Sequence, residues 1–188
     1  MANHPNRALE REFVARAFAS RLREDDLHDV LLYLNGLTDY RFTGVYRLTP
    51  GWTVSVALCD RENPQLRLGA NVKMTESYCW LTGVNNEALV IEDAPNDVRL
   101  GGHAARDAVR SYAAVLLRDV TRAAWGTLCH FDFSPRLSDP QTIAQLDIMR
   151  PLLEEMFVRD RAAPWHLEAL SGFAEPVDQA RLGGISFA

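Results

Sequence analysis

The chain contains 188 residues, of which 47% are hydrophobic and 24% are charged, and it carries a formal net charge of −5. This length suits one domain with terminal extensions, and the composition is that of a globular protein with a sizeable core. Acidic and basic residues are interspersed, without a basic stripe that carries interleaved aromatic residues, so we expect no nucleic-acid-binding surface. No apolar run approaches the roughly 18 residues that span a bilayer, so we expect no membrane association.

The three cysteines, Cys59, Cys79 and Cys129, are widely spaced and each lies among apolar residues. This usage, together with an N-terminus that lacks the apolar core of a signal peptide, predicts a reduced, cytoplasmic protein. Neither a C-x-x-C pair nor an H-E-x-x-H motif is present, so we expect no structural zinc site.

The N-terminal part of the chain favours two helices. Residues 9–22 place apolar side chains at helical spacing, and the charged residues 23–26 interrupt that stripe. Asp25 or Asp26 then caps a second helix over residues 27–38. We interpret residues 1–26 as a helical extension that precedes the domain.

Strand-like sequence follows. Residues 42–48 and 52–59 are rich in β-branched and aromatic side chains, and Pro50-Gly51 between them is typical of a hairpin turn. Residues 60–71 indicate a polar loop. A segment over residues 72–110, called the excursion below, begins with a short helix around Trp80.

The second half of the chain predicts further strands and one long helix. Residues 89–92 fit a short strand within the excursion, and residues 112–117 and 124–133 are two apolar strands. The helix over residues 140–160 contains Pro151, which we expect to kink or split it.

This order of elements predicts an α+β fold with a mostly antiparallel sheet of five or six strands. The two late strands are apolar on both sides, so both faces of the sheet should be covered. We expect the terminal helices, with Leu31 and Leu146, on one face and the excursion on the other. The domain then spans residues 27–162, and residues 163–188 form a C-terminal tail.

Residues 77–136 resemble the middle of a GAF domain. The similarity rests on an ordered series of motifs: Ser77-Tyr78-Cys79, Leu89-Val90-Ile91-Glu92-Asp93-Ala94, Asp97-Val98-Arg99-Leu100, His103, Val109-Arg110-Ser111-Tyr112, Val115-Leu116-Leu117, Gly126-Thr127-Leu128-Cys129-His130-Phe131-Asp132 and Pro135-Arg136. The chain departs from the usual pattern at Val98 and Leu116, where proline is common, and at Pro151. The resemblance, strongest to bacterial GAF domains that occur alone or beside signalling enzymes, implies a sensor whose ligand lies between the sheet and the excursion.

The resemblance also implies what the chain lacks. GAF-like reductases of free methionine-R-sulfoxide carry clustered cysteines in the excursion, whereas Cys79 is the one cysteine there. The Asn-Lys-Phe-Asp-Glu signature of the cyclic-nucleotide subclass is absent. The Cys-His pair at which bilins attach is also missing, because Trp80 follows Cys79. We therefore expect that the chain is not an enzyme, and its ligand or cofactor is left open.

Three candidate site residues belong to the excursion. Cys79 lies at a helix start, which favours a reactive thiol, but buried free cysteines are common core residues. Trp80 offers a face on which a planar ligand stacks. Asp93 is interpreted mainly as a turn former that accepts the backbone N–H groups of residues 95–97, and otherwise as a ligand contact.

The other candidates surround His130, a polar residue in an apolar strand. A lone buried histidine is more often a core residue than a ligand, because binding needs partners. Arg110, Ser111 and Tyr112 would supply such partners through a guanidinium fork and two hydroxyls. We predict that His130, Arg110, Tyr112 and Trp80 converge on one cavity for an anionic or carbonyl-bearing ligand.

Two functional hypotheses follow for a chain that is not an enzyme. The first is a sensory or regulatory module that binds a small ligand and signals through its terminal helices or a partner protein. The alternative is a ligand-free module for dimerisation and docking. Because GAF domains often dimerise through their first and last helices, the resemblance implies a homodimer in either case.

Overall fold

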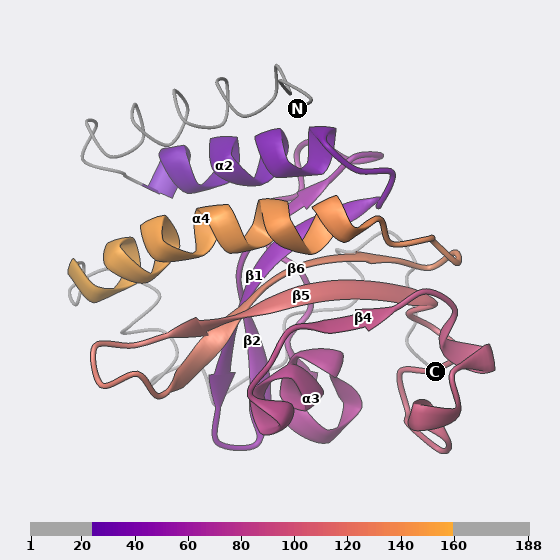
Figure 1. Cartoon of the computed structure of the whole chain (residues 1–188). Helices are drawn as coiled ribbons and strands as arrows, with labels where there is room; N and C mark the ends of the chain where they lie inside the picture. Colours follow the sequence, from indigo (N-terminus) through magenta and orange to yellow (C-terminus); the bar gives the residue numbers. More distant parts are fainter. Residues whose placement is uncertain (1–23, 160–188) are drawn as a thin grey trace, which may run out of the picture.

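The computed structural model describes residues 24–159, which form a six-stranded sheet between two helical layers (Figure 1). The strand order is β3-β2-β1-β6-β5-β4, and each neighbouring pair runs antiparallel. In chain order the strands are β1 (Phe42–Thr49), β2 (Trp52–Asp60), β3 (Val72–Lys73), β4 (Leu89–Ile91), β5 (Ser111–Arg118) and β6 (Ala124–Asp132). The predicted α+β fold with a mostly antiparallel sheet is confirmed.

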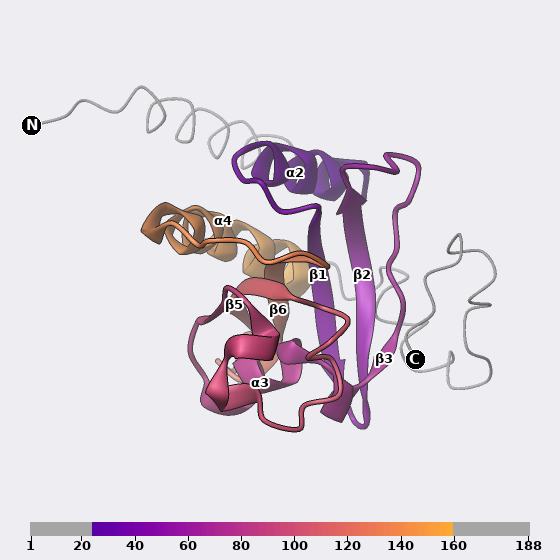
Figure 2. The same ribbon diagram turned by 90° about the vertical axis from the view of Figure 1, so that its right-hand side faces the viewer.

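The first hairpin forms where the sequence predicts it. Gly51 in its turn has a φ of 83°, a left-handed conformation that glycine adopts without a steric penalty. Figure 2 shows β1, β2 and β3 side by side. The two-residue strand β3 was not predicted, because two residues are too short to display an alternation of apolar and polar side chains.

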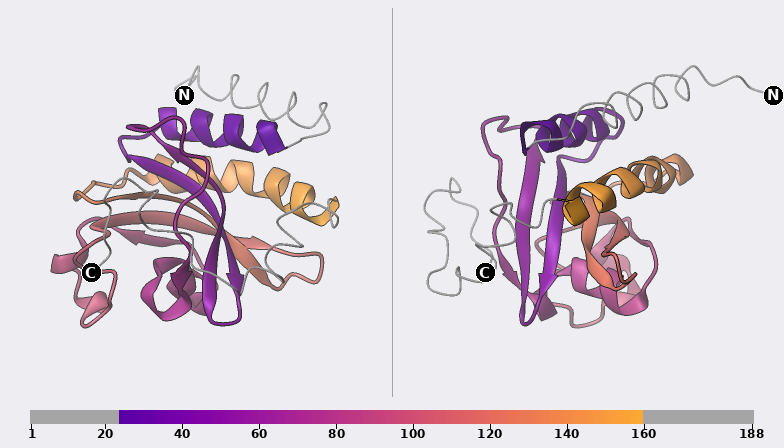
Figure 3. Two further views of the ribbon diagram at one scale, coloured as in Figure 1. Left: turned by 180° about the vertical axis from the view of Figure 1, so that it is seen from behind. Right: turned by 90° about the vertical axis from the view of Figure 1, so that its left-hand side faces the viewer.

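The helices divide between the two faces of the sheet. Helices α2 (Glu24–Gly36) and α4 (Pro140–Arg159) lie next to each other over one face, as Figure 3 shows from two further sides. Helix α3 (Tyr78–Asn85) and the short 3₁₀ helices η2 (Ala94–Asn96) and η3 (Val98–Leu100) belong to the excursion and lie on the other side.

Strand alternation divides the core into two clusters. On the face that α2 and α4 cover, Leu31 and Leu146 are fully buried in one cluster with Val115 and Leu128. This placement confirms that both terminal helices pack on the same face. Burial of each leucine side chain contributes roughly 1.5–3 kcal/mol. Residues of the opposite parity, such as Tyr112, form the second cluster beneath α3.

Helix α4 does not split at Pro151, one of the two outcomes predicted there. The helix continues from Pro140 to Arg159, so the expected split is absent. Pro151 is exposed, and the backbone carbonyl that loses its helical hydrogen bond one turn earlier therefore lies on the solvent side of α4. Water satisfies a carbonyl at such a position.

Two predicted segments lie outside the residues that the structure describes. The predicted helical segment 9–22 and the predicted tail 163–188 lie outside residues 24–159. Within that range, none of the helices combines the length and the apolar character needed to cross a bilayer.

Gly126 should be indispensable for the pairing of β1 with β6. A Cβ atom at this position would lie 2.3 Å from the backbone oxygen of Tyr46, whereas a Cβ at Gly36 meets nothing within 4 Å. We expect Gly126→Ala to lower the free energy of unfolding by about 3 kcal/mol, because the strand backbone must shift. Gly36→Ala is the matched control and should change it by less than about 1 kcal/mol. Urea unfolding measures both values, and equal effects would contradict the close packing of β1 against β6.

Candidate functional site

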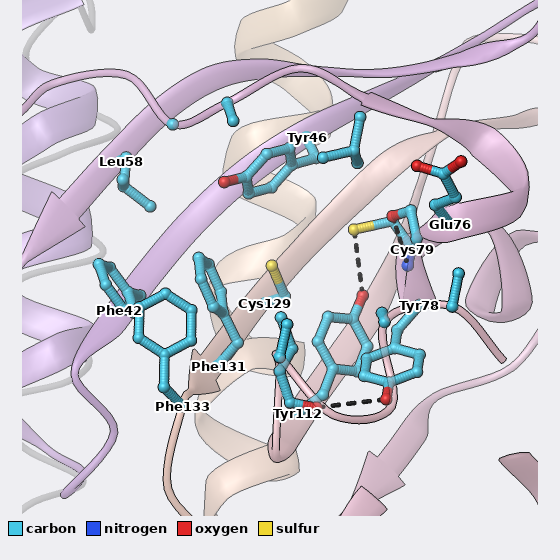
Figure 4. A pocket seen from close by; sticks show the side chains of 18 of the residues that line it. Phe42, Tyr46, Leu58, Glu76, Tyr78, Cys79, Tyr112, Cys129, Phe131 and Phe133 are labelled. Atoms are coloured by element: carbon cyan, nitrogen blue, oxygen red, sulfur yellow. Dashed lines mark hydrogen bonds between the residues drawn. The ribbon is translucent and has the colours of Figure 1, made fainter. Parts of the chain in front are cut away.

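A cavity of about 430 Å³ lies between the sheet and the excursion, on the face that α2 and α4 leave free (Figure 4). The sheet supplies one wall, and helix α3 and the segments around residues 66–70 and 104–109 supply the others. The lining residues are Phe42, Tyr46, Leu58, Leu66, Gly69, Ala70, Val72, Glu76, Ser77, Tyr78, Cys79, Ala104, Ala105, Ala108, Val109, Tyr112, Cys129, Phe131 and Phe133.

Aromatic rings dominate the sheet wall of the cavity. Phe42 and Phe131 face each other across the β1–β6 pair, with ring centroids 4.6 Å apart. Tyr46 meets the edge of Phe131 at 6.2 Å, and Tyr78 from α3 lies 5.6 Å from Tyr112. Every second residue of a strand points to the same face, so three adjacent strands present their aromatic side chains to one space.

The tyrosine hydroxyl groups around the cavity are held in place. Tyr78 donates a hydrogen bond to the carbonyl of Val109, at 3.2 Å. Burial raises the pKa of Tyr78 to about 12 and that of Tyr46 well above its usual range, so both phenols stay neutral. A Cβ at Gly69 would lie 2.3 Å from the Tyr46 hydroxyl, and glycine therefore allows residues 66–70 to close over that ring.

Formal charge is scarce in the cavity wall. Among its lining residues, Glu76 alone is charged, and its exposed carboxylate pairs with Lys73 at 3.4 Å. The Arg41 guanidinium lies 4.7 Å from the centre of the Phe42 ring, but Asp60 engages it with two hydrogen bonds of 2.8 and 2.9 Å. The wall therefore favours an uncharged, apolar occupant.

Two thiols, Cys79 and Cys129, face this cavity from opposite walls. Cys79 is in the first turn of α3, where Ser77 caps the helix by accepting its backbone N–H at 3.1 Å. Cys129 belongs to β6 and is fully buried. The Tyr112 hydroxyl donates a hydrogen bond to the Cys79 sulfur at 3.3 Å (Figure 4).

The two thiols differ in acidity. Burial opposes the charged form of Cys79, but the polar groups around its sulfur, among them the Tyr112 hydroxyl, outweigh burial and lower the pKa of Cys79 to about 6. Burial raises the pKa of Cys129 well above its usual range, and the neighbouring Cys79 adds to the effect. Of the two thiols, Cys79 is therefore the one that loses its proton more readily.

Comparison with solved structures identifies the fold. The GAF domain of the Acinetobacter phosphoenolpyruvate-protein phosphotransferase superposes with a TM-score of 0.68, at 17% identity, over 87% of this chain and 98% of that one. The phycocyanobilin-bound GAF domain of a cyanobacterial phytochrome gives 0.61, at 17% identity, over 85% and 97%. This chain has a GAF-like fold. No protein-family model and no curated protein matches the sequence.

A third structure corrects the expectation that the chain is not an enzyme. The free methionine-R-sulfoxide reductase of Neisseria meningitidis, solved with its substrate, superposes with a TM-score of 0.62, at 16% identity, over 84% of this chain and 93% of that one. The GAF-like fold thus also includes enzymes, so the expectation that the chain is not an enzyme, which was based on its few cysteines and absent motifs, is wrong: the fold does not exclude an enzyme. Cys79 and Cys129 are far apart in the sequence, but folding brings both to one cavity.

Of the predicted site residues, Cys79 and Tyr112 line the cavity of this GAF-like domain. Trp80 is half-buried on α3 and is not among the lining residues. Ser111 is buried and donates its hydroxyl to the carbonyl of Ser134, at 2.8 Å. The predicted convergence of His130, Arg110, Tyr112 and Trp80 on one cavity is therefore wrong.

His130 points to the opposite face of the sheet. Its ring stacks on Tyr40 at 5.7 Å, and its Nδ1 shares a hydrogen bond of 2.8 Å with the Thr43 hydroxyl. Its parity in β6 matches that of Leu128, which packs beneath the terminal helices, and not that of Cys129. Burial lowers the pKa of His130 to about 3, so the imidazole is a neutral part of the core.

Arg110 and Asp93 neutralise each other outside the cavity wall. The Arg110 guanidinium donates to an Asp93 oxygen at 2.6 and 3.0 Å. The other Asp93 oxygen accepts a hydrogen bond from the Asn96 side chain, at 2.6 Å. Asp93 thus stabilises the turn through side chains, in place of the predicted backbone N–H groups. The guanidinium fork expected to bind an anion is occupied.

The aromatic side of the cavity was not predicted from the sequence. Phe42, Tyr46, Phe131 and Phe133 were not predicted as site residues, although Phe131 shares its strand parity with Cys129. Following the face that does not contain His130 would have revealed this side of β6. The strand register that brings Phe42 opposite Phe131 joins distant segments and leaves no local sequence signal.

The buried, neutral state of His130 makes stability depend on pH. The pKa of His130 is about 3 in the folded chain and about 6.5 in the unfolded chain. Between these two values the unfolded chain binds a proton that the folded chain does not, so the free energy of unfolding decreases as the pH is lowered below about 6.5. Between pH 7 and pH 5 we expect the wild type to lose about 2 kcal/mol more unfolding free energy than His130→Leu. Chemical unfolding at each pH measures this difference, and parallel pH profiles would contradict it.

Proposed function

We propose that this GAF-like chain is a sensory module whose cavity binds a small, uncharged, largely aromatic molecule. One observation carries the proposal: a cavity of about 430 Å³ with six aromatic side chains and one peripheral carboxylate in its wall. Apolar cavities of this size, with a few polar groups for orientation, are typical ligand sites. The pairing of Arg110 with Asp93 favours a neutral ligand over the anionic one that the sequence suggested.

The central strands connect the cavity to the terminal helices. In β5, Tyr112 faces the cavity, whereas Val115 packs in the cluster beneath α2 and α4. A ligand that binds one arrangement of this shared wall more tightly than another shifts the populations of both. This layout supports the proposal that the chain signals through its terminal helices to a second copy or a partner protein. All three thiols are free, which favours a reducing, cytoplasmic compartment.

Indole is a suitable neutral probe, and indole-3-carboxylate is its anionic counterpart. At a free concentration 100 times its Kd, indole should stabilise the folded chain by about 2.7 kcal/mol and raise Tm by about 5 °C or more. Ala108→Trp should fill the cavity and abolish this shift, because Ala108 lines it. Ala123→Trp, at an exposed position outside the lining, is the matched control and should retain the shift.

The anionic probe separates the ligand classes in the same thermal-shift assay. Indole-3-carboxylate should stabilise the chain less than indole does, because its charge loses hydration without gaining a cationic partner. A larger shift with the carboxylate would restore the anion hypothesis. If neither probe nor a wider set of neutral aromatic compounds shifts Tm, the ligand-free docking module is the better account.

We also propose that the chain dimerises through α2 and α4. Leu32 on α2 and Ile148 on α4 are each 44% exposed, although both belong to helices that pack side by side. The double variant Leu32→Asp/Ile148→Asp should be monomeric in light scattering coupled to size exclusion, because the new charges would be buried in the interface. Val98→Asp, at a residue 94% exposed in the excursion, is the control and should leave the dimer intact. A monomeric wild type would contradict the proposal.

A further inference from the structure

Cys79 and Cys129 form a pair with a polarised environment, which an ordinary buried thiol lacks. Both side chains are at most 5% exposed and both line the cavity. The Tyr112 hydroxyl donates a hydrogen bond to the Cys79 sulfur at 3.3 Å, and the Cys129 thiol donates one to the carbonyl of Gly44 at 3.5 Å. Two thiols that face one cavity supply both electrons that a disulfide-forming oxidation removes.

The third cysteine shows what an inert thiol in this fold looks like. Cys59 is 2% exposed and packs in the cluster beneath the terminal helices, on the other face of the sheet. Burial raises the pKa of its thiol. The chain therefore contains its own control, a cysteine of similar burial that does not reach the cavity.

We propose that Cys79 and Cys129 are a redox-active dithiol that a small hydroperoxide, admitted to the cavity, oxidises to a disulfide. Hydroperoxides are uncharged and carry an electrophilic oxygen. The aromatic wall accommodates the organic group of an alkyl or aryl hydroperoxide while Cys79 approaches the peroxide oxygen. This activity goes beyond reversible ligand binding and uses the same space.

The reaction proceeds in two balanced steps. The Cys79 sulfur attacks the terminal oxygen of the hydroperoxide, the O–O bond breaks, and the alcohol leaves with the proton that the thiol gave up, which produces a sulfenic acid on Cys79. The Cys129 sulfur then attacks the Cys79 sulfur and the S–O bond breaks. Water leaves with the Cys129 proton, and a Cys79–Cys129 disulfide remains. One hydroperoxide is reduced for each dithiol oxidised.

The assignment of roles follows from the contacts. Cys79 is the attacking sulfur, because it accepts the Tyr112 hydrogen bond and lies in the first turn of α3, where helix N–H groups favour negative charge. Cys129 resolves the sulfenic acid from the facing strand. Tyr112 is a positioning residue, since its hydroxyl contacts sulfur and takes no covalent part.

Counting alkylatable thiols in the full-length, reduced chain tests the proposal. Cumene hydroperoxide should lower the number of thiols that iodoacetamide labels after unfolding from three to one, and peptide mapping should place the remaining label on Cys59. The reaction should be faster than with hydrogen peroxide, because the cavity wall is apolar. Three labelled thiols after treatment, equal oxidation of Cys59, or the reverse order of oxidants would overturn the proposal.

Variants separate the two steps. In Cys129→Ser the reaction should stop at the sulfenic acid, which dimedone labels on Cys79, whereas Cys59→Ser should behave as the wild type. Tyr112→Phe should slow the oxidation of Cys79 about tenfold, the effect of one pKa unit, without changing the disulfide that forms. Oxidation of Cys59 and of the Cys79–Cys129 pair can be compared within the wild-type chain. This comparison needs no variant, so the proposal stays testable if a variant fails to fold. The rise in Tm that indole causes in the Cys79→Ser variant tests ligand binding separately, because this variant lacks the attacking thiol.

Discussion

Strands β1, β6 and β5 are buried on both faces, and this constraint determines where each of their side chains acts. Leu128 packs against the terminal helices, whereas Cys129, one residue further along, faces the cavity. A shift of one residue in the pairing would exchange the two sets. The register that joins Phe42 to Phe131 therefore creates the hydrophobic support under α2 and α4 and the aromatic wall of the site at once.

The cavity persists because the groups around it are large and held in place from outside. Stacked rings such as Phe42 and Phe131 resist collapse, and the hydrogen bond from Tyr78 to Val109 ties α3 to the end of the excursion. The charged pair of Arg110 and Asp93 stabilises the excursion without entering the cavity. Polar contacts thus hold the frame, while the interior remains apolar.

Much of the fold was predictable from the sequence because it is encoded locally. The β-branched and aromatic residues of 42–48 and 52–59, the apolar runs 112–117 and 124–133 and the helical spacing before and after them predict the elements, and their order is that of the GAF fold that the chain resembles. The site was less predictable, because it depends on register between distant strands. His130 attracted attention as a polar residue in an apolar strand, but it is a neutral core residue with Thr43 as its partner. Cys79 was identified by its place at a helix start and Tyr112 as a partner proposed for His130, whereas the aromatic residues around them look like ordinary core residues in the sequence.

The proposed function depends on a preformed apolar cavity between the sheet and the excursion. Xenon binds such cavities and requires no knowledge of the natural ligand. In a crystal of the protein pressurised with xenon, the account predicts a strong peak enclosed by Tyr46, Tyr112 and Phe131, the residues that form the wall around the two thiols. The absence of xenon from this space, with the aromatic rings packed against α3 in its place, would contradict the account.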